Sequence, residues 1–388
     1  MSPASITAKR ELAFEAESWP CGTPPLQDFN GKLADVDVLV SRRDMQQMDE
    51  CVKAVHLVVA SPNYQAQVLA LAPELARAQP QRTSGLFSGF DFHLTPSGPR
   101  LIEINTNAGG AFYAALISDA RFKKGLPEAQ PLSHWQALFV AHLRSEWARA
   151  GKSALRTVAI VDDQPQSQFL RLEFHVAARM LQQAGITAII ASPEELEYRQ
   201  DRLWRGSTQI DFVYNRLTSF DLARAVDKPL HDALLNGAAV ISPDPRTHAL
   251  FASKQNLIIL GKDERLRGVI PNTQKVTAEN ANALWHDRDQ YYFKPINGYG
   301  SRGVYAGAKL TSKTWNEIVS TDQYIAQEKV DPARIDMPDG QSMRFDIRNF
   351  TYNGTVFMRI ARVYRGQTTN FRTPNGGFAP VLTNHDPN

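Results

Sequence analysis

Apolar and polar residues alternate over residues 90–94 and again over residues 101–105, with the turn-forming run Thr-Pro-Ser-Gly between them. Strict alternation is typical of a β-strand with one buried face, so the pattern predicts a β-hairpin. We expect a three-residue loop, 96–98, in which Gly98 adopts the left-handed conformation.

This register sets Asp91 opposite Glu103 and His93 opposite Leu101. Because side chains alternate along a strand, Asp91, Glu103 and Asn105 are expected on one face. The other face, which packs on a core, is expected to carry Phe90, Phe92, Ile102 and Ile104.

Two carboxylates and an amide on one strand face predict a cation site. Neighbouring carboxylates repel each other unless a cation lies between them. Oxygen ligands alone suit a hard ion such as Mg²⁺, which keeps some waters and usually completes its shell with phosphate. The alternative is a solvent-facing strand that binds nothing.

Helical spacing of apolar residues appears on both sides of the hairpin. It predicts helices over residues 42–59 and 63–78 before the hairpin, and helices starting at residue 111 and covering 133–150 after it.

Residues 155–245 alternate between short apolar runs and helical stretches, which predicts a small parallel sheet with flanking helices. Strands are expected at 157–161, 187–191, 211–215 and 238–242, with helices over 167–184, in the polar stretch after 191 and before Gly237. Ligands of such sheets bind beyond the carboxyl ends of the strands, where Asp162, Asn215 and Arg216 lie.

The last third of the chain is predicted to be rich in strands. A helix containing Lys254 precedes strands at 291–295, 304–306 and 324–330. Longer strands, 344–352 and 355–364, flank an Asn-Gly turn, the strongest short hairpin signal. Residues 370–388 are expected to be irregular.

The run 298–303, Gly-Tyr-Gly-Ser-Arg-Gly, satisfies G-x-G-x-x-G. A dinucleotide-binding loop of this kind needs a helix directly after it, whereas a strand pattern follows here. We therefore expect a flap whose backbone covers nucleotide phosphates, with Lys294 at the preceding strand end and Lys254 within reach; a glycine-rich hairpin without a ligand is the alternative.

Arginines gather near the Asn-Gly hairpin and make an anion-binding surface a reasonable hypothesis, because guanidinium groups bind phosphate and carboxylate in pairs of hydrogen bonds. A charged outer face is the alternative. Because side chains alternate between the two faces of a strand, Arg348 and Arg362 are expected on the face that even-numbered residues take. The charged residues concerned are Asp346, Arg348, Arg359, Arg362, Arg365 and Arg372.

Composition narrows the class of protein. The chain has 388 residues, enough for two or three subdomains, and a formal charge of +3 from 43 basic and 40 acidic residues mixed along its length. No basic stripe indicates nucleic acid, and no apolar run is long enough for a membrane span. Two cysteines make no disulfide framework or zinc site, and the start has no signal-peptide pattern, so we expect a soluble cytoplasmic protein.

Four segments together resemble the ATP-grasp superfamily. The hairpin resembles its metal-binding hairpin, YFKPINGYGSRGV its phosphate-binding flap, YIAQEKV its adenine-binding strand and hinge, and residues 346–377 the ligases that add glutamate to ribosomal protein tails. The metal hairpin usually comes last, whereas here it comes first. This order resembles the circular permutation of eukaryotic-type glutathione synthetases, whose metal motif is also Glu-Ile-Asn-Thr. Those enzymes carry a metal-binding glutamate where this chain has Gly298, so Asp91 is the candidate for the missing carboxylate ligand.

The resemblance implies a mixed α+β and α/β architecture: a permuted ATP-grasp fold with a small parallel-sheet (Rossmann-like) substrate domain. The expected parts are an N-terminal helical segment (1–84), the metal hairpin with helices (85–150), the substrate domain (151–245), the lobe with the flap (246–330) and the C-terminal lobe (331–388).

The resemblance also implies an ATP-dependent carboxylate–amine ligase that forms an acyl phosphate and uses Mg²⁺, with Mn²⁺ as an alternative. Its substrates are expected to be small, an amino acid or short peptide. The resemblance leaves open whether the protein forms a homodimer. The alternatives are an ATP-grasp kinase acting on a hydroxyl and a non-catalytic nucleotide-binding protein. The implied roles are catalysis by Arg362 and Arg372; ATP binding by Lys254, Lys294, Gly298, Gly300, Ser301, Gly303, Gln327, Glu328 and Val330; metal binding by Asp91, Glu103 and Asn105; and substrate binding by Asn107, Asn215 and Arg216.

Overall fold

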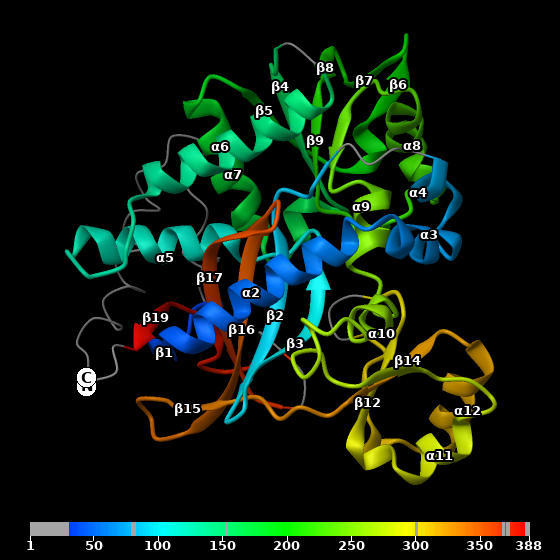
Figure 1. The fold of residues 1–388 in the computed structure, drawn as a ribbon. Helices are drawn as coiled ribbons and strands as arrows, with labels where there is room; N and C mark the ends of the chain where they lie inside the picture. Colours follow the sequence, from blue (N-terminus) through cyan, green and yellow to red (C-terminus); the bar gives the residue numbers. More distant parts are fainter. Residues whose placement is uncertain are drawn as a thin grey trace.

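A six-stranded antiparallel sheet forms the middle of the structure and joins segments from the first and last thirds of the chain (Figure 1). The structure is a computed structural model, and it describes residues 31–78, 83–151, 154–298, 302–366, 369 and 373–384. The strands of this sheet are β2 (Ser88–Thr95), β3 (Gly98–Asn105), β15 (Arg334–Asp336), β16 (Ser342–Tyr352), β17 (Thr355–Tyr364) and β18 (Gly377–Ala379).

The β2–β3 hairpin has a tighter loop than the sequence predicted. Thr95 pairs with Gly98, which leaves a two-residue loop, and Gly98 has a φ of 110° that favours glycine. His93 consequently lies opposite Arg100 and not opposite Leu101, so the predicted register near the loop is wrong.

A β-bulge just beyond this point corrects the register for the rest of the hairpin. The irregularity follows Asp91, and Asp91 lies opposite Glu103 as predicted. The extra residue turns Leu101 into the core and leaves Ile102 beside Glu103 on the pocket face, so the prediction of a core position for Ile102 is wrong. The bulge thus offsets the shorter loop, so that Asp91 and Glu103 still lie opposite each other on one face.

The β16–β17 hairpin forms as predicted around its Asn-Gly turn. Asn353 and Gly354 have φ values of 48° and 80°, as a type I′ turn requires. Asp346 lies opposite Arg362, and β16 also pairs with β2, where Arg348 lies opposite Asp91. The even-numbered charged residues of β16 and β17 therefore share one face with the polar residues of β2.

The two ends of the described chain lie together. β1 (Val38–Ser41) pairs in parallel with β19 (Val381–Asn384), and Leu33 bridges to Phe378. The prediction that the C-terminal residues are irregular is thus wrong for β18 and β19. This pairing, together with that of β2 and β16, gives the spatial order expected of a permuted chain.

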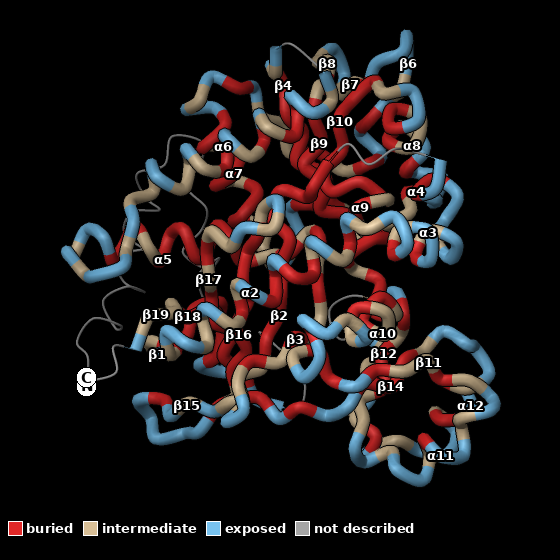
Figure 2. The backbone as a smooth tube through the Cα atoms, viewed as in Figure 1, coloured by how far each residue is buried: buried red, intermediate tan, exposed pale blue. Residues whose placement is uncertain are grey.

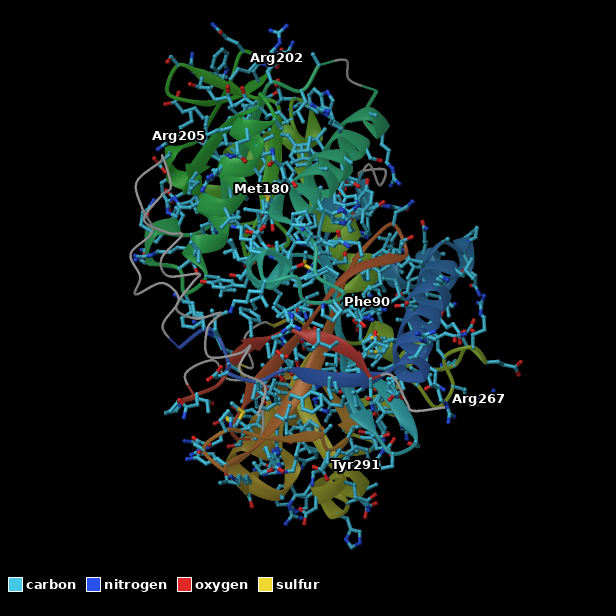
Figure 3. All side chains as sticks on the ribbon, turned by 90° about the vertical axis from the view of Figure 1, so that its left-hand side faces the viewer. Phe90, Met180, Arg202, Arg205, Arg267 and Tyr291 are labelled. Atoms are coloured by element: carbon cyan, nitrogen blue, oxygen red, sulfur yellow. The ribbon has the colours of Figure 1, made fainter. Side chains whose placement is uncertain are left out.

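Helix α2 covers one face of the central sheet (Figure 1). It spans Arg42–Val59 as predicted, and the Ser41 side chain caps it by accepting a hydrogen bond from the Asp44 N–H. The second predicted helix is interrupted before Pro73: α3 is Pro62–Ala70 and α4 is Glu74–Ala78. Figure 3 shows Phe90 in the interior, whereas Arg202, Arg205 and Arg267 project outward.

The opposite face of the central sheet packs on helices near the predicted positions: α5 (Ala111–Lys123), α6 (Leu132–Arg149) and α7 (Arg171–Gln183). Gly110 precedes α5 with a φ of 107°, and a Cβ added there would come within 2.6 Å of the Phe378 ring. The α5 start therefore requires glycine for both its conformation and its packing.

The predicted parallel sheet is present at one end of the molecule, in the order β10-β9-β4-β5. Its helix α8 is Lys228–Leu235, and the polar stretch predicted as helical instead forms mainly a three-stranded antiparallel sheet, β6-β7-β8. The strands are β4 (Thr157–Val161), β5 (Thr187–Ala191), β6 (Glu197–Arg199), β7 (Arg202–Arg205), β8 (Thr208–Ile210), β9 (Phe212–Asn215) and β10 (Val240–Ser242).

A small antiparallel sheet, β11-β14-β12-β13, lies at the other end with α11 (Ala281–His286) and α12 (Ser312–Thr321), both largely exposed in Figure 2. Lys254 was predicted within a helix, but it lies in a turn between α9 (Pro245–Phe251) and α10 (Asn256–Leu260). Within the described chain, no helix has the length and apolar character needed to cross a membrane. The strands are β11 (Thr273–Lys275), β12 (Tyr291–Pro295), β13 (Tyr305–Ala306) and β14 (Tyr324–Glu328).

Candidate active site

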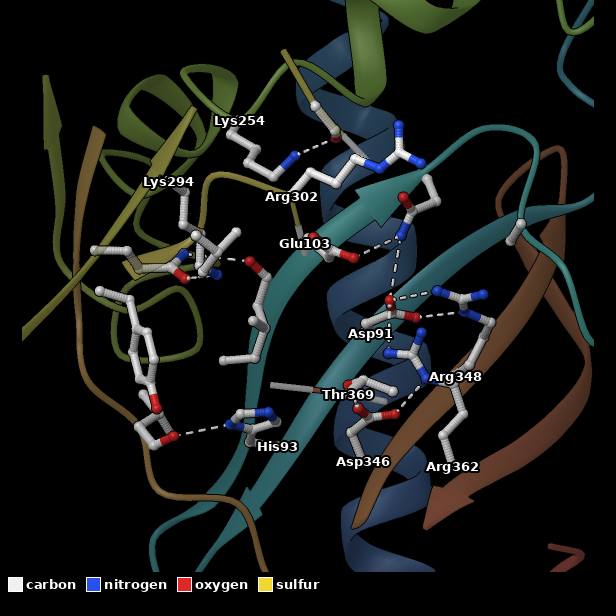
Figure 4. A pocket seen from close by; sticks show the side chains of 18 of the residues that line it. Asp91, His93, Glu103, Lys254, Lys294, Arg302, Asp346, Arg348, Arg362 and Thr369 are labelled. Carbon is white, nitrogen blue, oxygen red and sulfur yellow. Dashed lines mark hydrogen bonds and ion pairs between the residues drawn. The ribbon is translucent and has the colours of Figure 1, made fainter. Parts of the chain in front are cut away.

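A pocket of about 300 Å³ lies between the central sheet and the small antiparallel sheet (Figure 4). It is lined on one side by β2, β3, β16 and β17 of the central sheet, which come from both ends of the sequence, and on the other side by β12 and β14 of the small sheet. The residues predicted to bind ATP, metal, phosphate or substrate that line it are Asp91, Glu103, Asn105, Asn107, Lys254, Lys294, Gly298, Gln327, Glu328, Val330 and Arg362.

Asp91 lies at the centre of a buried set of charges. Its Oδ1 accepts from Arg348 Nε at 2.6 Å, and its Oδ2 accepts from Arg348 Nη2 at 2.6 Å and Arg362 Nη2 at 2.9 Å. Arg348 also donates from Nη1 to the Gly109 carbonyl at 2.9 Å. These contacts tie β2 to β16 and β17 and fix both guanidinium groups.

A second carboxylate continues this set. Arg362 Nε donates to Asp346 Oδ1 at 2.6 Å, and the Thr369 hydroxyl donates to Asp346 Oδ2 at 2.6 Å. Burial lowers the pKa of Arg362, but Asp346 and Asp91 raise it by more, so its pKa lies above the usual value and Arg362 stays charged. Figure 4 shows the four charged groups aligned along one wall of the pocket.

Glu103 faces the pocket beside Asn105. The Asn105 amide donates to Glu103 Oε1 at 3.0 Å and to Asp91 Oδ2 at 3.2 Å. Burial raises the pKa of Glu103, but Lys254 and Lys294 lower it by more, so the group is ionised at neutral pH. Glu103 is therefore a carboxylate placed among cations that come from the opposite wall.

Two buried lysines form that wall. Lys294 Nζ donates to Gln327 Oε1 at 2.6 Å, and burial lowers the pKa of Lys294 to about 8, with Glu103 opposing the shift. Lys254 Nζ donates to the Gly298 carbonyl at 2.8 Å, at the start of the glycine-rich run. Both ammonium groups thus lie where anionic oxygens in the pocket could replace a protein acceptor.

The predicted hinge contributes backbone and side chains to the same pocket. His93 Nδ1 lies 2.8 Å from the Val330 carbonyl, and burial lowers the pKa of His93. Gln327 Nε2 donates to the Ile102 carbonyl at 3.3 Å, which connects β14 to β3 across the pocket. The two walls are therefore linked by hydrogen bonds at the hinge side.

Several predicted residues lie elsewhere. Gly303 is described but does not line the pocket, and Gly300, Ser301 and Arg372 lie outside the described residues. Asn215 donates to the Pro243 carbonyl at 3.1 Å. Arg216 donates to the Asn107 carbonyl at 2.5 Å and the Ala108 carbonyl at 3.2 Å, next to the pocket but not in its lining.

The sequence named Asp346 and Arg348 among the charged residues of a possible anion-binding surface but gave neither a specific role, and both line the pocket with Arg362. His93 received no role but could have been indicated from the sequence, because alternation along β2 sets it on the face of Asp91, and both residues line the pocket. Thr369 and Arg302 also line the pocket, and neither lies in a strand pattern.

No protein-family model and no curated protein matches the sequence. Among solved structures, the chain is similar to GSS30, a glutathione synthetase-like effector from Globodera pallida in its apo form, with 14% identity, a TM-score of 0.60 and 98% of each chain covered. The chain has a circularly permuted ATP-grasp fold of the glutathione synthetase-like kind.

Two further structures align with this chain at lower TM-scores. A proposed gamma-glutamylcysteine synthetase from Methylobacillus flagellatus has 12% identity and a TM-score of 0.45, with 83% of each chain covered. The ATP-grasp ligase PsnB, bound to a minimal precursor, has 12% identity and a TM-score of 0.34, with 58% of this chain and 89% of PsnB covered.

Proposed function

We propose that this protein is an ATP-dependent ligase that joins a small carboxylate to an amine through an acyl phosphate. One observation carries the proposal: Glu103, two buried lysines and two buried arginines converge on a single pocket of the ATP-grasp fold. Pure structural salt bridges need no cavity between the partners, whereas phosphoryl transfer needs positioned charges around an open space.

The pocket can be tested for its fit to Mg²⁺. Glu103 is ionised and accepts a hydrogen bond only from Asn105 among the described residues, so its second oxygen is available. Carboxylate and amide oxygens suit Mg²⁺, which commonly takes one or two protein ligands and completes its shell with phosphate and water. Glu103 and Asn105 would hold the ion, which would neutralise phosphate charge and orient the γ-phosphate for attack.

The protein's own residues supply the other contacts. Lys254 and Lys294 would bind phosphate oxygens, and the segment Gln327, Glu328 and Val330 would hold the adenine ring. Arg362, with the predicted Arg372, would stabilise charge on the phosphoryl group as it moves to the substrate carboxylate. The glycine-rich run 298–303 would cover the phosphates, and Asn107 would contact the substrate.

The test is an ADP-release screen of amino acids and dipeptides, taken singly and in pairs, with Mg²⁺ and ATP. The proposal expects release that depends on two partners and a hydroxamate when hydroxylamine replaces the amine, because an acyl phosphate is trapped in that way. Release that needs one hydroxyl compound and gives no hydroxamate would instead indicate a kinase. Tight ATP binding without turnover would indicate a nucleotide-binding protein.

A further inference from the structure

Asp91 was predicted as a metal ligand from its position opposite Glu103, but the two carboxylates have different surroundings. Four hydrogen bonds reach Asp91, from Arg348 Nε, Arg348 Nη2, Arg362 Nη2 and Asn105 Nδ2. Three of these donors converge on Oδ2 and one reaches Oδ1, and a carboxylate oxygen offers about two lone-pair sites, so Oδ2 has no room for an ion and Oδ1 already holds a guanidinium hydrogen bond. A single hydrogen bond, from Asn105, reaches Glu103 within the described chain.

The charges around Asp91 also disfavour a divalent ion on its oxygens. Two guanidinium groups lie against Asp91, both buried, and an ion there would be close to both positive charges in a low-dielectric interior. Arg362 is in turn held by Asp346. Among the described residues, no three His, Cys, Asp or Glu side chains converge to hold a metal.

We propose that Asp91 is a positioning residue that orients Arg348 and Arg362 toward the pocket, and that Glu103 and Asn105 are the metal ligands of the protein. The inference rests on the proposed function. It changes the expected site from three protein ligands to two, with the remaining coordination positions supplied by phosphate and water. Asp91 acts through the arginines, which its two oxygens hold in one orientation.

The decisive measurement is Mn²⁺ affinity in the presence of ADP, by calorimetry on the full chain. D91N leaves an unbalanced guanidinium charge that repels the ion, so its affinity should fall. The double variant D91N/R348Q restores the charge balance and should recover Mn²⁺ affinity to within about threefold of the wild type. E103Q should lose at least about tenfold, and E103Q/R348Q should not recover, because a ligand is missing.

A second readout follows the arginines themselves. The ratio of affinities for AMPPNP and ADP reports contacts to the γ-phosphate, and D91N should lower this ratio whereas a merely structural role would leave it unchanged. The charge-balanced double variant keeps the Mn²⁺ test usable if D91N does not fold.

A double variant as weak in Mn²⁺ binding as E103Q would overturn the inference and restore Asp91 as a ligand. An unchanged AMPPNP-to-ADP ratio in D91N would overturn the positioning role. A wild-type protein that binds no nucleotide would instead refute the proposed function, and the inference with it.

Discussion

The β2–β3 hairpin and the carboxyl edge of the parallel sheet both carry polar residues that the sequence marked as ligands, but only the hairpin turns them toward the pocket. Glu103, Asn105 and Asp91 line it. At the sheet edge, Asn215 binds the Pro243 carbonyl and accepts from the Leu217 N–H at 3.1 Å, and Arg216 binds two backbone carbonyls.

The difference follows from where the backbone has unpaired groups. Inside a sheet, each strand pairs its N–H and C=O groups with its neighbours, so a polar side chain there finds little local backbone to bind. At a strand end the chain enters a loop, whose backbone groups need partners, and nearby Asn and Arg side chains supply them. Asp91 and Glu103, which lie within their strands, fit this account, whereas Asn105 ends β3 and still lines the pocket. A position within a strand therefore strengthens a ligand assignment without deciding it.

The largest expected effect tests the hairpin side of this comparison. Glu103→Ala should lower turnover by on the order of 10²–10³-fold, the usual cost of one lost transition-state contact. The fold should persist, because Glu103 accepts only the Asn105 hydrogen bond among the described residues. ADP release and thermal melting would check both points, with Arg362→Ala expected to lose turnover as well. Normal ADP release would reject the assignments.

The parallel-sheet side should respond in stability. Glu173 on α7 accepts from the Gly110 N–H at 2.9 Å and the Phe112 N–H at 3.0 Å, and it faces Arg216 at 4.0 Å. Glu173→Gln should lower the free energy of unfolding by about 2 kcal/mol, because a buried amide group would then face a backbone donor.

Urea denaturation would measure the stability change in Glu173→Gln, and Mn²⁺–ADP affinity would serve as its control. A variant of wild-type stability that loses nucleotide affinity would contradict the contrast between the two regions.

Much of this arrangement could be predicted from local patterns. Alternation along the strands placed Asp91, Glu103 and Asn105 on one face, and the Asn-Gly turn fixed the pairing of Tyr352 with Thr355. Both are properties of one hairpin, in which the turn dictates pairing over a few residues. The alignment of Asp346 with Arg362 also needs the register shift after Phe350, which the turn does not set.

The rest depended on contacts between distant segments. Nothing near Asp91 in the sequence shows that Arg348 will lie beside it, because that pairing requires β2 to meet β16, residues 257 apart. A prediction from strict alternation of apolar and polar residues likewise gives no sign of the bulge that moves Ile102 onto the pocket face. Lys254 was assigned to a helix because the apolar spacing of α9 and α10 continues through the turn that separates them.

The smallest expected effect concerns Lys294 on β12, another charged residue that lies within a sheet and lines the pocket. Burial lowers its pKa to about 8, so the ammonium is mostly charged at pH 7 and mostly neutral at pH 9. If that charge binds phosphate, ADP affinity should fall by up to about tenfold between these pH values, since one pKa unit corresponds to about 1.4 kcal/mol. Lys294→Met should bind ADP more weakly at pH 7 but show a flatter pH profile, which separates Lys294 from other titrating groups. An affinity in the wild type that stays constant or rises with pH would show that Lys294 serves its hydrogen bond to Gln327 and not the nucleotide.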